Sequence, residues 1–450
     1  MRPLRHAGRA TAVLAALAAV GSCRQVTDAP ASHERVPPPS PATAATAATA
    51  ATAAPACDAD NGGITLPAGF CATVFADGLL GARHVTVRPN GDVYVAIGGS
   101  GGAVGLRDTD GDGHADQRAG FGKAGGNGIA WNGTHLFLAE NTRVVRYAFK
   151  PNKLAPFGAA SVVVSGLPAG VEHVSKTIAF GAGTTMYLNF GSASNSCQVS
   201  NRSLESPGKD PCPELATRAG IWTGDAARLG QTTANLTRYA TGLRNTVALA
   251  VHPTGALYGV QMDRDNLYDN WPRLFSAQDD ARIPAEELFR IERGADYGWP
   301  YCYHDAVLGR KVLAPEYGGD GQVQGRCTAA QLPRLALPAH WAPMAMQFYA
   351  GTAFPASYQG GAFVSFHGDY FWGSRPRTDS PGYNVAYVPF VSGVPTGGYT
   401  VFASGFAGAS ATSRQTAVHR PTGLAVAPDG ALLIADDVGG RLWRVVYRGP

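Results

Sequence analysis

One short pattern recurs six times along this chain: an alternating strand, a turn that contains glycine, and a second strand. The copy that begins at His84 reads HVTVRPNGDVYVAIGG, and the copy that begins at Pro421 reads PTGLAVAPDGALLIADDVGG. Asn-Gly and Asp-Gly favour tight hairpins because they tolerate positive φ. The other copies begin at Gly128, Lys176, Val247 and Gly360. Six such hairpins predict an all-β fold, a six-bladed β-propeller in which each blade packs against its neighbours.

A β-sandwich is the main alternative fold, but a sandwich requires no hairpin pattern that recurs six times. The composition agrees with many turns and few helices, since the chain has 57 Gly and 31 Pro and only 16% charged residues. The longest stretch between hairpins separates the fourth from the fifth and contains EELFRIERGADYGWPYC. We expect this insertion at one end of the propeller, where long loops commonly carry function.

The N-terminal segment has the pattern of an export signal in residues 1–22: early arginines, an apolar run and small residues. The apolar run is too short for a permanent membrane helix. The letters VGSC are typical of bacterial lipoprotein signals and predict lipidation of Cys23, with an ordinary cleaved signal peptide as the alternative. Residues 23–56 are rich in Pro, Ala and Thr and predict a disordered linker before a propeller of residues 57–450. We therefore expect a periplasmic or exported protein that contacts the membrane only through a lipid anchor.

The net charge gives no sign of a nucleic-acid partner. The chain has 37 basic and 33 acidic residues, and three of the basic residues, Arg2, Arg5 and Arg9, belong to the predicted signal, which has no acidic residue. The remainder is nearly neutral and has no basic patch, so nucleic-acid binding is not expected.

Seven cysteines are an odd number for an exported protein, and lipidation of Cys23 would leave six. Six cysteines allow fifteen pairings. Closure of local loops is the simplest of these pairings. It joins Cys57 to Cys71, Cys197 to Cys212, and Cys302 to Cys327. Disulfides indicate an oxidising compartment. The sequence has no Cys-x-x-Cys-His motif, so covalently bound haem is not expected.

The motif DTDGDGHAD places aspartates at alternate positions, as in a calcium-binding loop. The candidate Ca²⁺ ligands are Asp108, Asp110, Asp112, the carbonyl of His114, and Asp116. Gly113 stands at the turning position, but Ala119 stands where a bidentate Glu is expected. The alternative is an acidic surface turn, although carboxylates this close repel one another without a cation. We expect a structural Ca²⁺ site that other oxygen atoms complete.

Polar residues precede three of the predicted inner strands in the same register. Arg244 and Asn245 precede the fourth hairpin, Arg420 precedes the sixth, and Glu172 and His173 precede the third. Each could be a structural residue, such as an arginine that binds loop carbonyls or a histidine satisfied by the backbone. Gathered around a propeller axis, they would be costly unless an anionic ligand lay among them.

The chain resembles the quinoprotein sugar dehydrogenases of the soluble glucose dehydrogenase and sorbosone dehydrogenase group, and it is most similar to the sorbosone type. The motifs that carry the resemblance are LPAGFCATVFADGLLGARHVTVRPNGDVYVA, LRDTDGDGHAD, TGLRNTVALAVHPTG, EELFRIERGADYGWPYC, AFVSFHGDYFWGSRPRTDSPGYNVAYVPF and RPTGLAVAPDGALLIADD. They extend over residues 64–447, and their order and number make the resemblance specific.

The resemblance implies a six-bladed propeller that holds pyrroloquinoline quinone (PQQ) near its axis. It implies that His173 is the catalytic base and that Glu172 orients the imidazole or the sugar. It also implies that Arg244, Asn245 and Arg420 contact the cofactor. The residue types suit this chemistry, because arginine recognises carboxylates and histidine is a good base near neutral pH.

The chain departs from the glucose enzymes at three places. His367 stands where those enzymes have a cofactor-binding lysine, as in the sorbosone type, and Thr422 stands in place of a second arginine. The letters VQMDRDN replace a Gly-Pro pair that binds the calcium of the cofactor, so Asp263 is expected to supply a carboxylate there. These three differences affect the expected affinity for PQQ and the expected sugar specificity.

The expected function is PQQ-dependent oxidation of an aldose or sugar aldehyde, with electrons passed to an external acceptor and the protein a monomer. A non-enzymatic propeller lipoprotein that binds carbohydrate or protein is the alternative. A metal-dependent, lactonase-like hydrolase is a third reading, for which only Glu172 and Asp263 offer carboxylates near the axis.

Overall fold

The computed structural model describes residues 56–170 and 172–449. The predicted signal segment, the lipidation site at Cys23 and the linker up to residue 55 lie outside the described residues. Within the described residues, no helix is long and apolar enough to cross a membrane.

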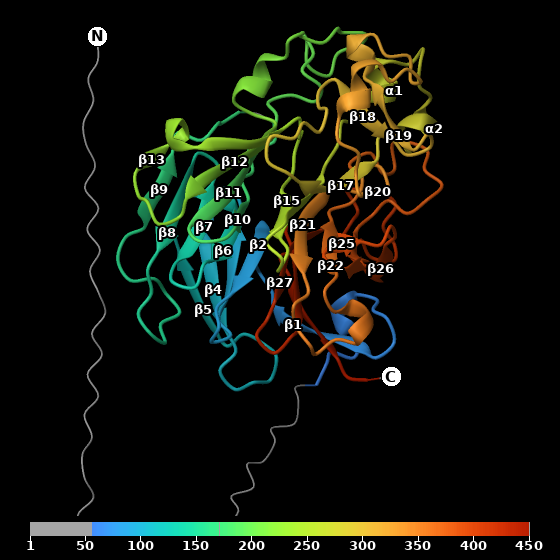
Figure 1. The fold of residues 1–450 in the computed structure, drawn as a ribbon. Helices are drawn as coiled ribbons and strands as arrows, with labels where there is room; N and C mark the ends of the chain where they lie inside the picture. The colour runs from blue at the N-terminus through green and yellow to red at the C-terminus, as the bar shows by residue number, and fades with distance from the viewer. Residues whose placement is uncertain (1–55, 171, 450) are drawn as a thin grey trace, which may run out of the picture. The chain divides into compact units, whose positions relative to one another are not determined.

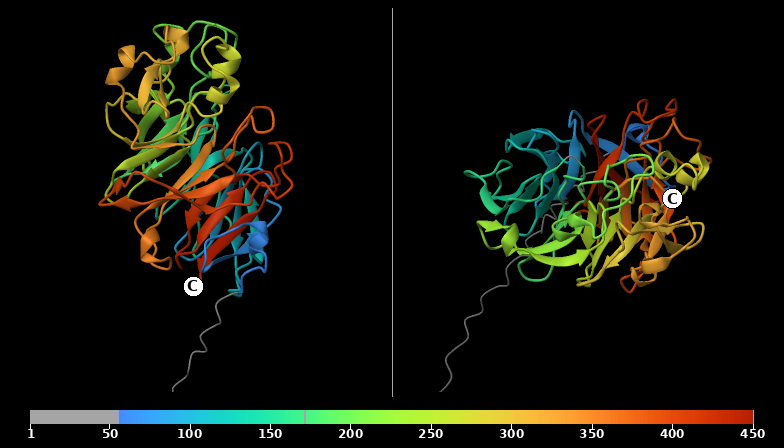
Figure 2. Two further views of the ribbon diagram at one scale, coloured as in Figure 1. Left: turned by 90° about the vertical axis from the view of Figure 1, so that its right-hand side faces the viewer. Right: turned by 90° about the horizontal axis from the view of Figure 1, so that it is seen from above.

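The described chain forms six blades, each a sheet of antiparallel strands, arranged in a ring (Figures 1 and 2). This arrangement confirms the six-bladed propeller. The first blade consists of β2 (Ala82–Val87), β3 (Val93–Ile97), β4 (Ala103–Arg107) and β5 (Gln117–Phe121). The second consists of β6 (Gly126–Trp131), β7 (Leu136–Glu140), β8 (Arg143–Tyr147), β9 (Ser161–Ser165) and the short parallel β13 (Gln231–Thr232). The third consists of β10 (Ile178–Phe180), β11 (Thr185–Phe190), β12 (Gly220–Asp225) and β14 (Thr237–Thr241).

The other three blades follow the same order from the axis outwards. The fourth consists of β15 (Ala248–Val251), β16 (Leu257–Gln261), β17 (Glu286–Ile291) and β20 (Leu335–Leu337). The fifth consists of β21 (Pro343–Phe348), β22 (Ala362–Phe366), β23 (Asn384–Val388) and β26 (Thr400–Ala403). The sixth consists of β27 (Pro421–Val426), β28 (Leu432–Asp436), β29 (Leu442–Tyr447) and β1 (Phe70–Ala76).

The remaining elements are short and lie in the connections. Two small hairpins are β18 (Cys302–Asp305) with β19 (Arg310–Leu313), and β24 (Phe390–Val391) with β25 (Val394–Pro395). The α-helices are α1 (Leu267–Asn270) and α2 (Ala277–Asp280). The 3₁₀ turns are Asn61–Gly63, Pro213–Ala216, Thr233–Asn235, Pro315–Tyr317, Gly325–Ala329 and Ala356–Tyr358.

Two expectations about the hairpins need correction. The strand expected to begin the fifth copy is β22, the second strand of its blade, and the inner strand β21 lies upstream of it. The letters EELFRI form β17, a blade strand, so the true insertion of the fourth blade begins after Ile291 and also includes the segment between β16 and β17.

The ring is closed by the first strand, β1, which pairs with the last strand, β29. Phe70 on β1 packs edge-to-face against Phe354 and Phe402 of the fifth blade, with ring centroids 4.8 and 5.0 Å apart. The two ends of the described chain therefore share one blade, and aromatic packing fixes that blade against its neighbour.

The six inner strands surround an axial channel of about 290 Å³. Glycine allows neighbouring inner strands to approach closely there. A Cβ on Gly128 would lie 2.8 Å from the Cα of Thr177, and one on Gly423 would lie 2.2 Å from the carbonyl oxygen of Arg83. Any side chain at these two positions would push blades apart at the axis.

The three local disulfides expected from the sequence are present: Cys57–Cys71, Cys197–Cys212 and Cys302–Cys327. The first ties the start of the described chain to β1, the second closes a loop after β11, and the third closes the insertion of the fourth blade.

We predict that Phe70→Ala lowers the free energy of unfolding by about 3–5 kcal/mol, because it leaves a cavity in the aromatic cluster that closes the ring. Phe157→Ala is a matched control, since Phe157 is 60% exposed, and it should cost less than about 1 kcal/mol. Denaturant unfolding of both variants measures the difference, and equal losses would contradict the closing role of β1.

Candidate active site

A belt of hydrogen bonds joins the inner strands at one end of the axial channel. Thr177 Oγ1 donates to the Val247 carbonyl at 2.8 Å and accepts from Asn127 Nδ2 at 3.2 Å. Thr422 Oγ1 donates to the Ala82 carbonyl at 2.9 Å. Thr422, where the glucose enzymes have an arginine, thus joins the sixth blade to the first. The belt forms a rigid base for the residues that precede the inner strands.

His173 precedes β10 and has the left-handed backbone angle φ = +46°. Its Nδ1 lies 2.9 Å from Ser192 Oγ and 3.1 Å from the Ser192 carbonyl oxygen. Ser192 Oγ donates its own hydrogen to the Ser194 carbonyl at 2.6 Å, so both partners of Nδ1 are acceptors. Nδ1 therefore carries the ring hydrogen, and Nε2 presents a lone pair.

A glycine makes room for this histidine. A Cβ on Gly191 would lie 2.5 Å from the Cβ of His173 and 3.2 Å from Oδ1 of Asn245. His173 and Asn245 therefore lie side by side, one before β10 and the other before β15, as their register in the sequence predicted.

Glu172 is held beside the imidazole, with its Oε2 4.0 Å from Nε2 of His173. Arg202 grips both carboxylate oxygens, with Nε 2.9 Å from Oε1 and an amino nitrogen 3.1 Å from Oε2. Asn201 Nδ2 donates to Oε1 at 2.7 Å. Burial raises the pKa of Glu172, but the hydrogen bond and charge of Arg202 outweigh it and leave the pKa below its usual value. Glu172 is thus an anion at neutral pH.

Burial and the charge of Arg244 lower the pKa of His173 to about 3, although Glu172 acts in the opposite direction. The imidazole is neutral at physiological pH, with Nε2 ready to accept a hydrogen bond or a proton. An anion bound nearby would raise this pKa towards the range in which histidine works as a base.

Arg244 is completely enclosed by protein acceptors. It donates to the Asn195 carbonyl and Oδ1, both at 3.0 Å, and to the carbonyls of Met262 and Asp263 at 3.2 and 2.6 Å. Its fifth donor reaches Oδ2 of Asp265 at 3.2 Å. The five N–H groups of the guanidinium all have partners. Arg244 thus offers a bound anion its charge but no free hydrogen bond.

Asn245 is buried, and its Oδ1 has no hydrogen-bond partner among the described residues. A buried acceptor without a donor is unusual and favours a ligand that brings an N–H or O–H group. Nδ2 of the same side chain contacts only the sulfur of Met262, at 3.8 Å.

His367 and Arg420 lie across the axis, where the fifth and sixth blades meet. Nε2 of His367 is 2.8 Å from Oδ1 of Asp437, and Arg83 donates to the other oxygen of Asp437 at 2.9 Å. Arg420 donates to the carbonyls of His367 and Gly368 at 2.9 and 3.3 Å. The second amino nitrogen of Arg420 has no hydrogen bond in the part of the chain that the structure describes.

Arginine side chains gather on this side of the site. Burial lowers the pKa of Arg420, and the charges of Arg414 and Arg83 lower it further, against the opposing effect of Asp437. The guanidinium groups of Arg83 and Arg420 thus lie near the carboxylate of Asp437, while Asp436 accepts the backbone N–H of Arg420 at 2.7 Å. Such an environment fits a ligand with several carboxylates.

Asp263 lies in a buried group of acidic side chains. Its backbone N–H donates to Glu286 at 2.9 Å, and its Oδ2 is buried without a partner in the described chain. Burial raises the pKa of Glu286 to about 8. A cation would relieve this arrangement, and Asp263 as a ligand stays a prediction.

The predicted calcium loop connects β4 to β5 at the outer edge of the first blade. Carboxylate oxygens of Asp108, Asp110 and Asp116 lie within 4.8 Å of one another. Asp112 is not in this group and accepts the His114 N–H at 2.8 Å, while the His114 ring bonds the Val74 carbonyl. This geometry is compatible with a three-carboxylate site far from the axis, and calcium binding stays a prediction.

Sequence reasoning missed four residues of the site. They are Asn195, Arg202, Asp265 and His340. Asp265 lies 3.2 Å from both Arg202 and Arg244 and 3.6 Å from His340 Nδ1. Burial lowers the pKa of His340, but Asp265 outweighs it and raises the pKa to about 9. Asn195 and Arg202 flank Cys197, so the predicted disulfide was the available signal that this loop is ordered.

The chain matches, over residues 64–448, the family model described as TrAA12-like. The chain belongs to this family. Among solved structures, it is similar to the PQQ domain of pyranose dehydrogenase from Coprinopsis cinerea, with 19% identity, a TM-score of 0.69, and 85% of this chain and 97% of that chain covered. It is also similar to a Trichoderma reesei enzyme of carbohydrate-active family AA12, with 19% identity, a TM-score of 0.70, and coverage of 86% and 98%.

Aldose sugar dehydrogenase from Escherichia coli has a TM-score of 0.55 and 14% identity to this chain, with coverage of 84% and 100%. At these identities the likeness shows a shared fold. A curated relative from Borreliella burgdorferi, described as an uncharacterized protein, is 29% identical over 214 residues, which are 46% of this chain and 48% of the relative. The chain thus spans about half the length of that relative.

Buried neutral histidines should make stability depend on pH. Burial lowers the pKa of His304 to about 4. The unfolded chain takes up this proton near pH 6.5 and the folded chain does not, so His304 destabilises the fold as the pH falls from 6.5 towards 4. Between pH 7 and 5, the loss in free energy of unfolding should be about 2 kcal/mol smaller in His304→Gln than in the wild type.

Urea unfolding at the two pH values measures this difference. The comparison between the two proteins is needed because Glu286, with its raised pKa, acts in the opposite direction throughout this range. An identical pH dependence in both proteins would show that folding does not lower the pKa of His304.

Proposed function

We propose that this protein is a PQQ-dependent dehydrogenase that oxidises an aldose or a sugar aldehyde and passes the electrons to an external acceptor. The observation that carries the proposal is the arrangement of His173: its Nδ1 is held by Ser192, its Nε2 is unprotonated, and Glu172 lies 4.0 Å from Nε2. The names of the similar structures, which include a PQQ domain and an aldose sugar dehydrogenase, support the choice of cofactor and substrate class.

The residues on both sides of the propeller axis fit PQQ. Arg420 and Arg83 would bind its carboxylates, and the unpartnered Oδ1 of Asn245 would accept a hydrogen bond from its pyrrole N–H. Arg244 would contribute its charge, and His367, tied to Asp437, would line the site. When bound, PQQ supplies the acceptor for the hydride that leaves the substrate carbon.

His173 would accept the hydroxyl proton of the sugar at Nε2. Ser192 fixes the ring hydrogen on Nδ1, so the lone pair of Nε2 is the only basic position of the ring. Glu172 would stabilise the imidazolium that forms, and Arg202 keeps that carboxylate ionised and in place. The carboxylates of a bound cofactor would raise the pKa of His173 from its low value.

We further propose that Ca²⁺ binds the Asp108, Asp110 and Asp116 carboxylates and stabilises the first blade, and that Asp263 is a second candidate ligand. We also propose a lipid-anchored monomer in the periplasm, on the grounds of the VGSC motif and the three disulfides.

A propeller lipoprotein that binds carbohydrate or protein without catalysis is the second candidate function. The complete enclosure of Arg244 by protein acceptors favours it, because that residue has no N–H group left for a cofactor. The hydrolase reading has less support, since no cluster of three metal-ligating groups in the described chain includes Glu172 or Asp263.

We predict that His173→Gln lowers dye-linked oxidation of the substrate by about 10²–10⁴-fold, the range expected for loss of a general base, with PQQ affinity nearly unchanged. The test reconstitutes the protein with PQQ and Ca²⁺ and screens aldoses and sugar aldehydes. His135→Gln, in the turn that connects β6 to β7, serves as the control. Failure of the wild type to bind PQQ would favour the non-enzymatic alternative.

Arg420→Gln should weaken PQQ binding by about tenfold or more, because a charged hydrogen bond to a carboxylate is lost. Arg228→Gln is a matched control, since Arg228 is exposed and forms no ion pair with another described residue. Quenching of protein fluorescence by PQQ reports the affinities, and equal affinities of the two variants would remove Arg420 from the cofactor site.

A further inference from the structure

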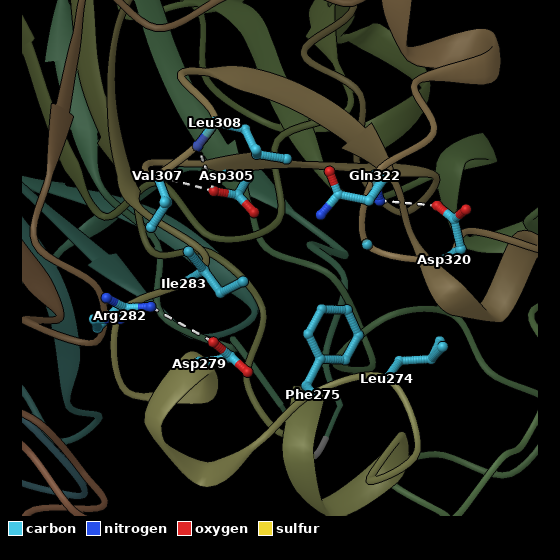
Figure 3. A pocket seen from close by; sticks show the side chains of 11 residues that line it. Leu274, Phe275, Asp279, Arg282, Ile283, Asp305, Val307, Leu308, Asp320 and Gln322 are labelled. Atoms are coloured by element: carbon cyan, nitrogen blue, oxygen red, sulfur yellow. Dashed lines mark hydrogen bonds and ion pairs between the residues drawn. The ribbon is translucent and has the colours of Figure 1, made fainter.

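A second pocket, of about 190 Å³, lies in the insertion of the fourth blade (Figure 3). Its walls come from helices α1 and α2 with the residues that follow them, from the β18–β19 hairpin, and from the turn at residues 320–322. It shares no residue with the site around His173 or with the axial channel. Nothing in the proposed dehydrogenase reaction uses it.

The floor of this pocket is apolar and fixed. Phe275 and Ile283 are 5% and 6% exposed and belong to one hydrophobic cluster with Tyr303, and Leu308 packs against that cluster. Gly321, which has no side chain, leaves the edge of the Phe275 ring accessible from the pocket. A preformed floor with an aromatic edge is typical of small-molecule sites.

One carboxylate is buried yet incompletely bonded. Asp305 is 5% exposed, and its Oδ1 accepts the N–H groups of Val307 and Leu308 at 2.8 and 2.9 Å. The other oxygen has no hydrogen-bond partner among the described residues and points into the pocket (Figure 3). Two backbone donors thus hold the side chain still while one acceptor stays available.

Donors as well as acceptors face the same space. The carboxamide of Gln322 makes no hydrogen bond within the described chain, and it is directed towards Asp305 (Figure 3). Asp279, anchored by Ser276 at 2.7 Å, adds a carboxylate, and Arg282 adds a guanidinium 3.5 Å from it. Three carboxylates, with that of Asp320 included, thus line the apolar floor together with one carboxamide and one guanidinium.

We infer that this pocket is a carbohydrate subsite that takes one neutral pyranose ring. Each sugar hydroxyl both donates and accepts, so it needs the mixed set of Asp305, Gln322, Asp279 and Arg282, whereas the apolar face of the ring suits Phe275 and Ile283. An organic ammonium ion would use only the carboxylates, and an anion would be repelled by them. The volume of the pocket equals that of about six water molecules at ~30 Å³ each. This space suits one sugar ring and is too small for a chain of two or more rings.

The test uses the full chain without PQQ and the probe methyl β-D-glucopyranoside, which has no free anomeric hydroxyl and is no aldose substrate. We expect saturable binding in the millimolar range by saturation-transfer NMR. Affinity should fall about tenfold or more in Gln322→Ala and in Asp305→Asn, the second of which keeps the acceptor for the two backbone N–H groups. Gln117→Ala, an exposed position on β5, is the matched control and should bind as the wild type does.

Three outcomes would overturn the inference: no binding of the glycoside, equal binding by all variants, or binding of n-butylammonium in place of the glycoside. Circular dichroism confirms that each variant is folded. The result does not depend on the proposed dehydrogenase, because the probe is not oxidised and no cofactor is present. Dye-linked turnover, if found, should be unchanged in Gln322→Ala.

Discussion

The structure depends on the close approach of six strands at one axis. A side chain cannot fit where Gly128 faces Thr177 or where Gly423 faces Arg83, because the neighbouring backbone lies within 3 Å of any Cβ. The same crowding leaves backbone carbonyls of the inner strands near the axis, and hydroxyl and amide side chains such as Thr177 bind them. Blade packing, the belt of hydrogen bonds and the placement of the site all follow from this convergence.

Ion pairs determine the arrangement of the site around His173, next to the belt of hydrogen bonds. Arg202 lies between Glu172 and Asp265 and forms ion pairs with both carboxylates, which would otherwise repel each other. Arg244, held by carbonyl oxygens, lowers the pKa of His173 and so keeps the imidazole neutral. Across the axis, Arg83 and Arg420 lie near Asp437. The ion pairs that line the site are partly buried, where such interactions are stronger than at the surface.

The hairpin pattern predicted five of the six inner strands correctly and failed at the fifth. There a long connection separates β21 (Pro343–Phe348) from β22 (Ala362–Phe366), and no Asn-Gly or Asp-Gly turn joins them. The disulfides were predictable because each closes a short loop. Asp265 and His340 could not be found in this way, since 75 residues of mostly irregular chain separate them and only the fold brings them to 3.6 Å.

The sequence by itself determined the number of blades and the register that places His173, Asn245 and Arg420 before inner strands, and it favoured the three local disulfides. These are local properties, because a turn, a short loop and a strand boundary each depend on residues that are adjacent in the sequence. Only the tertiary structure decided which partners those residues have. Arg244 is enclosed by four residues because segments distant in the chain meet there, and hydrogen bonds depend on distance in space.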